Sequence, residues 1–385
     1  MPLIVEPWRR REIPPFRELV APLGGVMEHI TPLASRGNRP LQMTFEDQLH
    51  ALIYFHLEEH TSGRHLLQAL KEDERARCIA PENGIEKSSF FEAVNARGLK
   101  QLLEVFEGLE KEARGLLPME HAELGDLVAV DGSLIDATLS MAWADYRKGA
   151  KKAKVHVGFN VNQSIPQKIY LTEGKGDERP FVEKIVHKGQ TAVTDRYYQC
   201  HRDFDRWQEK GIHFVCRIRA NTRKEVIREN GVPSNGIVFY DAVVSLGTSG
   251  VNKMEREVRV VGYHIDGKEY WVATDRHDLT SEQVALAYKL RWNIEIFFGW
   301  WKRHLRVYHL IARTRYGVMV QMLAGLITYL LLAIYCHNTH GEKVSIRRVR
   351  ELRIKIRNAE AAMIEQDTAE RQESDIGLPI SGART

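Results

Sequence analysis

Cysteine is scarce in this 385-residue sequence. The four cysteines stand far apart, and none forms a C-x-x-C pair with another. Zinc ribbons and disulfide frameworks are built on closely spaced cysteines, so the sequence argues against both kinds of protein. A reducing cytoplasm is the compartment that this cysteine usage favours.

Long apolar runs are also lacking, with one exception. The first eight residues are interrupted by prolines and followed by arginines, so we expect no signal peptide. Residues 318–335 are apolar enough to suggest a membrane span, but they include Gln321 and Thr328, and no second candidate accompanies them. We therefore expect a buried core helix at this position and no membrane partner.

A strong excess of charge of one sign is absent as well. The chain has 55 Lys and Arg against 51 Asp and Glu, a formal net charge of +4. This mild basicity is compatible with a polyanionic partner but does not by itself indicate one. Hydrophobic residues make up 43% of the chain, enough for a sizeable core and two or three domains.

Helical patterning dominates the chain before about residue 120. Thr44 to Asp47 resembles the capping box that opens a helix, and apolar residues at helical spacing follow it. Ser89 to Glu92 resembles a second such box. This part of the chain is therefore predicted to be all-helical.

Short β-branched runs appear after residue 120. Two of them end on an acid, at Asp131 and at Asp195. The two runs that follow Asp131 predict a three-stranded meander, and a helical stretch after Asp195 precedes another strand. This alternation predicts a mixed α/β sheet. The expected strands cover residues 127–131, 155–161, 167–172, 191–195 and 213–218.

Residues 221–268 form a glycine-punctuated, β-rich segment that we interpret as an insertion. A hairpin turn is predicted at Asp266-Gly267. A long helix is expected beyond Ser281. The tail after about residue 370 is polar, short of large apolar side chains, and expected to be disordered.

Asp131, Asp195 and Glu295 are the candidate catalytic acids. Cleaving a phosphodiester needs an activated nucleophile and neutralised phosphate charge, which two divalent cations held by carboxylates can supply. The three acids lie far apart in the chain, so their site would be assembled by tertiary structure. Taken singly, an Asp that ends a strand is commonly a turn or cap residue, and a helical Glu is usually solvated.

The surroundings of Glu295 favour the catalytic interpretation. Steps of three, four and seven residues place four polar side chains on one stripe of an α-helix: Tyr288, Arg291, Glu295 and Lys302. We expect this stripe to be free to meet phosphates, although a solvated surface stripe is the simpler alternative. Four apolar side chains at other angles are expected to pack against a sheet: Ile294, Phe297, Phe298 and Trp301.

These residues resemble the DDE transposases of the bacterial insertion-sequence family 4, whose signature is Y-x2-R-x3-E-x6-K on the helix that bears the catalytic glutamate. All four positions of the stripe match. The resemblance extends over about residues 127–335 and includes both aspartates. Arg196-Tyr197-Tyr198 follows Asp195 where a glycine is common in the family.

The resemblance implies an RNase H-like mixed-sheet catalytic core interrupted by a β-rich insertion, with an all-helical N-terminal domain and a helical C-terminal region. The expected parts are a helical DNA-binding domain at 1–120, the core at 121–220 and 269–340, the insertion at 221–268, and a C-terminal helix with a disordered tail at 341–385. It also implies cut-and-paste transposition by a bacterial enzyme in the cytoplasm, at the nucleoid.

The resemblance further implies the cofactors and partners. Asp131, Asp195 and Glu295 would bind two Mg²⁺ ions, which Mn²⁺ can replace. Tyr288, Arg291 and Lys302 would position DNA phosphates. The partners would be double-stranded DNA, as terminal inverted repeats and as target, and a second copy of the chain in a synaptic homodimer.

Other basic residues are candidate DNA contacts. A basic run between the first two expected strands could grip phosphates, although such runs are commonly solvated and inert: Arg147, Lys148, Lys151 and Lys152. Lys154 and His156 could face the substrate or be packing residues. A second set of cations from Lys302 to Arg315 alternates with aromatic residues, among them Trp300, and suits phosphate contacts combined with stacking.

Three points stay open. The chain could be a DNA-binding regulator that keeps the fold without cutting, although its complete set of acids argues against this. It could be a structure-selective nuclease that never joins strands. In related enzymes a tryptophan can hold a flipped base, and here Phe239, Tyr240 or Trp271 could take that place, or the DNA could follow another route.

Overall fold

The computed structural model describes residues 13–34, 41–72, 76, 79–81, 84–232, 234 and 236–376, without the side chains of 360 and 363–376. The chain divides into two compact units, one of Met1–Leu109 with His304–Thr385 and the other of Glu110–Arg303. The expected domain borders at 120, 268 and 340 do not coincide with this division. The functional assignment of those domains stays a prediction.

The first unit is built from helices throughout its described residues, as expected for the N-terminal part. Helix α6 begins in this unit and ends in the second. The helices are α1 (Pro14–Val20), α2 (Leu23–Met27), α3 (Phe45–Leu57), α4 (Gly63–Glu72), α5 (Lys87–Ala96), α6 (Leu99–Leu116), α11 (Arg315–His340) and α12 (Ile346–Ile376).

Only one of the two expected capping boxes exists. At the start of α3, the Thr44 hydroxyl accepts the Asp47 N–H at 3.1 Å, and the Asp47 carboxylate accepts the Thr44 N–H at 2.9 Å. The box expected at Ser89 is wrong, because α5 begins at Lys87 and Ser89 lies in its first turn. Its hydroxyl donates to the Gln42 side chain instead.

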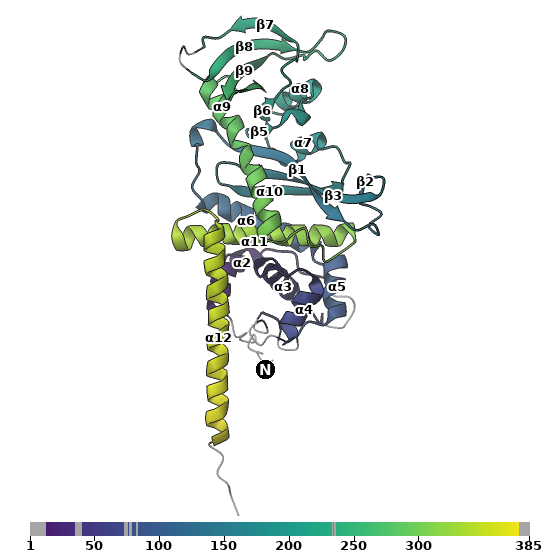
Figure 1. Cartoon of the computed structure of the whole chain (residues 1–385), viewed down its shortest axis with the longest axis vertical. Helices are drawn as coiled ribbons and strands as arrows, with labels where there is room; N and C mark the ends of the chain where they lie inside the picture. Colours follow the sequence, from purple (N-terminus) through teal and green to yellow (C-terminus); the bar gives the residue numbers. More distant parts are fainter. Residues whose placement is uncertain are drawn as a thin grey trace, which may run out of the picture. The chain divides into compact units, whose positions relative to one another are not determined.

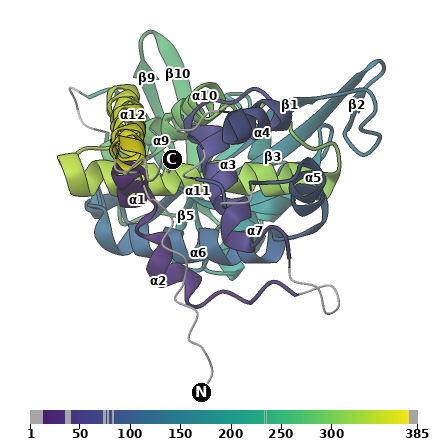
Figure 2. The same ribbon diagram turned by 90° about the horizontal axis from the view of Figure 1, so that it is seen from below.

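Helix α11 is the core helix that the sequence predicted. It is long and apolar enough to cross a membrane, but 94% of its most apolar window is buried in the structure. Helices α3 and α5 contact it within the first unit (Figure 2). The polar side chains that argued against a span are satisfied internally, since Gln321 donates to the His309 carbonyl and Thr328 to the Ala324 carbonyl.

Helix α12 corrects the prediction for the tail. It continues to Ile376, so the disorder expected from about residue 370 is wrong for the first part of that segment. Residues 377–385 lie outside the described residues.

The second unit is built on a ten-stranded sheet of order β2-β3-β1-β5-β6-β10-β9-β8-β7, with β4 also paired to β3 (Figure 1). Its strands are β1 (Leu127–Ala137), β2 (Asp145–Arg147), β3 (Ala150–Asn160), β4 (Ile165–Glu173), β5 (Thr191–Thr194), β6 (His213–Arg217), β7 (Lys224–Glu229), β8 (Val238–Leu246), β9 (Val258–Ile265) and β10 (Lys268–Thr274). Its short helices are η2 (Ala122–Leu124), η3 (Arg179–Phe181), α7 (Val182–Ile185), η4 (Arg196–Tyr198) and α8 (His201–Glu209); α9 (Ser281–Leu290) and α10 (Trp292–His304) follow.

The strand directions confirm the mixed α/β class. Strands β1, β3 and β4 form the predicted antiparallel meander, whereas β5 and β6 run parallel to β1 and to each other. The β-rich segment extends this same sheet through β10, which pairs with β6. The predicted turn at Asp266-Gly267 joins β9 to β10, with φ of 50° and 72°. Such left-handed pairs are typical of two-residue hairpin turns.

Helices cover both faces of the sheet, and β3 shows which helix lies where. A Cβ on Gly158 would lie 2.2 Å from the Ile185 side chain of α7. Its neighbour Phe159 stacks on Phe297 of α10, with ring centroids 4.9 Å apart. Because successive residues of a strand point to opposite faces, α7 and α10 lie on opposite faces of the sheet.

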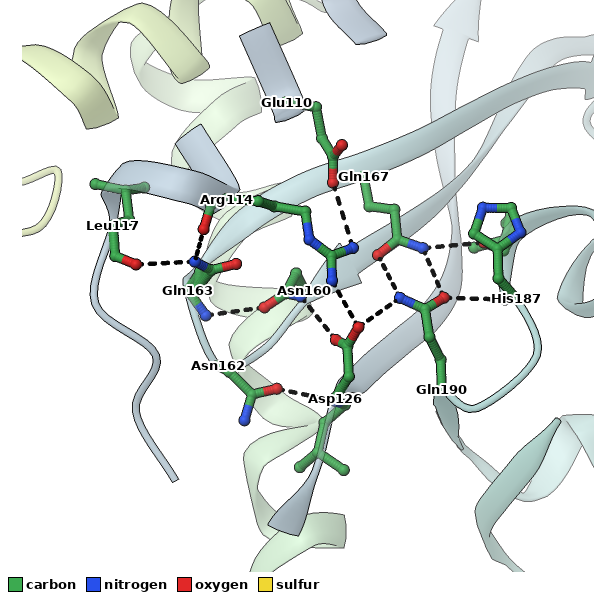
Figure 3. Close-up of polar contacts among 12 residues, drawn as sticks. Glu110, Arg114, Leu117, Asp126, Asn160, Asn162, Gln163, Gln167, His187 and Gln190 are labelled. Carbon is green, nitrogen blue, oxygen red and sulfur yellow. Dashed lines mark hydrogen bonds and ion pairs between the residues drawn. The ribbon is translucent and has the colours of Figure 1, made fainter. Parts of the chain in front are cut away.

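The Asp126 carboxylate ties together the segments that meet where β1 begins (Figure 3). It accepts hydrogen bonds from the side chains of Arg114 at 2.6 Å, Asn160 at 2.9 Å and Gln190 at 2.8 Å. The Asp126 carbonyl also accepts the Thr191 N–H. The end of α6, the end of β3 and the start of β5 are thereby joined to β1 at one residue.

We expect Asp126→Ala to lower the free energy of unfolding by about 2–4 kcal/mol, because three donors, of which Asn160 and Gln190 are buried, would lose a charged acceptor. Urea unfolding followed by tryptophan fluorescence measures the change. Asp136→Ala is the matched control, since this acid lies on the same strand with its side chain 85% exposed and pairs with Lys152. Equal losses in the two variants would contradict a clamping role for Asp126.

Candidate active site

Asp131 lies within β1, where the neighbouring strand β5 has already ended. Strand β1 pairs with β5 only over Leu127–Ala129, but with β3 as far as Ala137. The prediction that the strand ends on Asp131 is therefore wrong, because pairing with β3 carries it six residues further. Only one edge of β1 is open at Asp131, and this is the edge that faces the end of β5.

Asp195 follows β5 directly, as predicted. It caps the short helix η4, and its Oδ1 accepts the Tyr197 N–H at 2.8 Å. The register pairs Ala129 with Val193. Asp131 and Asp195 each lie two residues beyond that pair, so the parallel strands place both aspartates at the same level of the sheet.

The Asp131 carboxyl is partly buried, and nearby positive charge compensates it only in part. Burial raises its pKa to about 7, and the negative charges of Glu178 and Asp195 act in the same direction. A hydrogen bond from the Gly132 N–H and the charge of Arg291 oppose the rise. A cation beside this carboxyl would favour its ionised form.

Glu295 reaches the same face of the sheet as Asp131. Asp131 pairs with Val157 of β3, which points to the same face as Phe159 and therefore toward α10. Glu295 lies in the first turn of α10 and accepts a hydrogen bond from Arg291 at 2.6 Å. Its side chain is 34% exposed, against 11% for Arg291.

The helix that carries the four-residue stripe differs from the prediction in two respects. It is interrupted at Arg291, because α9 ends at Leu290 and α10 begins at Trp292. Tyr288 and Arg291 are buried, with 7% and 9% of their surfaces exposed, so the expected free cationic face is wrong at these two positions. The guanidinium of Arg291 lies 5.7 Å from the centre of the Tyr288 ring.

Lys302 binds the backbone of β1. Its ammonium donates to the Leu134 carbonyl at 2.6 Å, and burial lowers its pKa. The apolar side of α10 packs as predicted, with all four of its expected core residues buried. Trp300, predicted as a DNA contact, is partly buried. Lys302 thus fastens the end of α10 to the strand of Asp131.

The basic run lies in a hairpin rather than a loop between strands. Arg147 ends β2, and Lys151 and Lys152 belong to β3. Lys151 pairs with Asp145 at 3.3 Å and Lys152 with Asp136 at 2.7 Å. Arg147 and Lys148 are exposed at the tip.

His156, left open by the sequence, is a packing residue. Its ring stacks on Phe181 with centroids 4.0 Å apart, and one ring nitrogen lies 2.9 Å from the Thr172 hydroxyl. Burial lowers its pKa to about 3, so the ring is neutral at physiological pH. Lys154 pairs with Glu178 at 2.9 Å.

Glu178 and Tyr198 belong to the surroundings of the site but were missed in the sequence. The Tyr198 hydroxyl donates to Glu178 at 3.1 Å, and burial raises the pKa of that hydroxyl well above its usual range. One signal was available. A glycine directly after Asp131, inside a strand, indicates that another group approaches the backbone closely there.

The three aromatic residues considered for holding a flipped base form one cluster. Trp271 contacts Phe239 and Tyr240, with ring centroids 5.2 and 5.1 Å apart. The Lys224 ammonium lies 4.3 Å from the centre of the Trp271 ring. The cluster is on β8 and β10, in the extension of the sheet.

The three acids have the donor atoms that a divalent cation needs, but their side chains are not gathered around one point. Carboxylate oxygens are the donors that Mg²⁺ prefers, and the charge of Arg291 compensates Asp131 only in part. Within the described residues, however, no three Asp, Glu, His or Cys side chains lie close enough to hold an ion. Glu295 is engaged with Arg291 instead.

Comparison with known proteins gives a family match. Residues 123–331, which include all three acids, match the family described as Transposase DDE domain. The chain is 30% identical to a probable transposase for insertion sequence element IS5377 from Geobacillus stearothermophilus over 50% of this chain and 52% of the relative. It is 26% identical to a putative transposase for insertion sequence element IS4SA from Synechocystis over 65% of this chain and 72% of the relative. The match to the first relative thus spans about half of that protein's length.

Arg291→Met is expected to lower the free energy of unfolding by about 1–2 kcal/mol, because the buried cation holds Glu295 and packs on Tyr288. Urea unfolding of the full chain measures this loss. Lys289→Met is the matched control, since Lys289 is an exposed cation near the end of α9. If both variants lost the same free energy of unfolding, the ion pair between Arg291 and Glu295 would not contribute to stability.

Proposed function

Because the chain belongs to the family of DDE transposases, we propose that it cuts DNA at the ends of its own insertion sequence and joins the freed 3′-hydroxyl to target DNA. The spacing from Tyr288 to Lys302 predicted a DDE transposase, and the family match confirms this prediction. One observation carries the catalytic assignment. Asp131 and Asp195 each lie two residues beyond the Ala129–Val193 pair of β1 and β5, and Glu295 lies on α10, which covers the face of β1 toward which Asp131 points.

Asp131, Asp195 and Glu295 would hold two Mg²⁺ ions, for which Mn²⁺ can substitute. Bound ions of this kind lower the pKa of a water or hydroxyl nucleophile and neutralise the charge that develops on the phosphate. Burial raises the pKa of the Asp131 carboxyl, and a bound cation would favour its ionised form. Arg291 would orient Glu295 through their ion pair.

Tyr288, Arg291 and Lys302 would help to position the DNA phosphates indirectly, by holding α10 in place. Tyr288 and Arg291 are buried, Arg291 bonds to Glu295, and Lys302 bonds to the β1 backbone. These contacts support a role in holding α10 in place beside the DNA phosphates. Direct phosphate contacts suit the exposed cations better. Arg147 and Lys148 at the hairpin tip are such cations, and Lys151 and Lys152 follow them on β3.

The expected partners follow from this function. They are double-stranded DNA carrying the terminal inverted repeats, the target DNA, and a second copy of the chain that synapses two ends. The site of action would be the bacterial nucleoid in the cytoplasm. A cut-and-paste route is proposed, and the cluster around Trp271 is where an unpaired base could stack.

Asp131→Asn, Asp195→Asn and Glu295→Gln should each reduce cleavage by more than about 100-fold, since loss of a group that only supports a metal ligand already costs 10–100-fold. Purified protein would be incubated with Mg²⁺ and labelled DNA from the flanks of its gene, and products separated on denaturing gels. Asp136→Asn, an exposed acid on the same strand, should cut normally.

The same reactions separate the alternatives. A regulator without catalytic activity would shift the labelled DNA without nicking it, and a structure-selective nuclease would nick it without joining the 3′-end to a target plasmid. Retained cleavage by Asp131→Asn would refute the assignment of that acid.

Arg147→Ala combined with Lys148→Ala should weaken DNA binding and reduce the slope of log K against log salt by about 2, because each phosphate contact contributes roughly 0.9. Fluorescence anisotropy at several salt concentrations measures the slope. The control is Lys188→Ala with Lys210→Ala, two exposed cations before the starts of β5 and β6, at the opposite ends of these strands from Asp195. An unchanged slope in the hairpin variant would exclude the hairpin from the DNA contacts.

A further inference from the structure

Glu178 joins two segments that flank the candidate acids. Its carboxylate pairs with Lys154 of β3 at 2.9 Å and accepts the Tyr198 hydroxyl of η4 at 3.1 Å. Both members of the ion pair are largely buried, with 15% and 11% of the side chains of Glu178 and Lys154 exposed.

The same carboxylate packs directly on the backbone of β1. A Cβ atom on Gly132 would lie 2.5–2.7 Å from the three atoms of the Glu178 carboxylate. Real side chains do not approach so closely, so any residue other than glycine at this position would displace Glu178. Gly132 is the residue directly after Asp131.

Glu178 lies on the opposite face of β1 from the Asp131 carboxylate. Gly132 pairs with His156, and Asp131 pairs with Val157, so the two neighbours point to opposite faces of β1. Glu178 packs on the face of Gly132, whereas Asp131 points toward α10. Glu178 is therefore placed to support the site from behind rather than to share an ion with Asp131.

Tyr198 links Glu178 to the turn that contains Asp195. It is the last residue of η4, the single turn that Asp195 caps through the Tyr197 N–H. The Tyr198 side chain is fully buried, so its bond to Glu178 anchors that turn in the core. Movement of Glu178 would shift Asp195 relative to Asp131.

We propose that Glu178 is a positioning residue for the metal site, which sets the turn of Asp195 against the strand of Asp131 through its contacts with Tyr198, Lys154 and Gly132. This inference rests on the proposed function, because it assumes that both aspartates bind divalent cations. Glu178 positions the two aspartates through the hydrogen bond from Tyr198 and through its packing on Gly132. A negative charge at position 178 is not itself required.

Mn²⁺ binding to the full chain tests the proposal without depending on cleavage. Electron paramagnetic resonance measures the free Mn²⁺ and so gives the dissociation constant. Glu178→Leu, Tyr198→Phe and Gly132→Ala should each weaken binding by roughly 10–100-fold, the usual effect of losing a group that orients a ligand. Glu178→Gln keeps an oxygen that accepts the Tyr198 hydroxyl, so it should bind Mn²⁺ close to the wild-type value.

Glu183→Leu is the matched control. Glu183 lies on α7, its side chain is also 15% exposed, and it pairs with Arg206 and Lys210. Its loss should lower thermal stability without changing Mn²⁺ affinity. If Glu178→Leu does not fold, Tyr198→Phe still tests the proposal, because it removes a single oxygen atom.

The possible outcomes are distinct. Wild-type affinity in Glu178→Leu or Tyr198→Phe, with binding lost in Asp195→Asn, would overturn the positioning role and leave the metal site standing. Loss in Glu178→Gln as large as in Asp195→Asn would make Glu178 a ligand and also overturn it. Unchanged binding in Asp195→Asn would overturn the proposed metal site and this inference with it.

Discussion

The pairing of β1 with β5 is the constraint on which the candidate site depends. Two carboxylates on different strands can face the same ion only if those strands stay in one register. Asp126 secures that register, because its carbonyl bonds to the start of β5 and its carboxylate holds α6, β3 and Gln190. Since the clamp lies at the opposite end of the paired strands from the aspartates, it stabilises their position without occupying the site.

The second constraint is the negative charge that gathers around Asp131, where the carboxylates have little contact with water. Asp131, Asp195 and Glu178 gather negative charge around β1, and the protein compensates only part of it, through Lys154 and Arg291. Glu295 and Glu178 each have a cation of their own, whereas burial leaves Asp131 with a raised pKa. Such an arrangement costs stability in the free protein and favours the binding of a cation. The unit thus carries electrostatic strain where catalysis is proposed.

Much of the second unit could be predicted because its signals are local. Short β-branched runs located β5 and β6, and a dipeptide located the turn from β9 to β10. The prediction failed at Asp131 because the length of β1 depends on a distant partner, β3, and at Ser89 because a capping pattern also occurs inside a helix. It failed at Tyr288 and Arg291 because helical spacing shows which residues share a face but not what covers it.

The sequence by itself determined the family and the order of the three acids, since residue types and their spacing on one helix are properties of the chain alone. It also indicated a core helix at α11, because Gln321 and Thr328 interrupt the apolar stretch and no second candidate accompanies it. The burial of that helix was decided by the structure. Only the tertiary structure decided that Asp131 and Asp195 share a level, that Arg291 holds Glu295, and that Glu178 lies behind Gly132. These facts depend on strand register and on the alternation of faces, which contacts between distant segments determine.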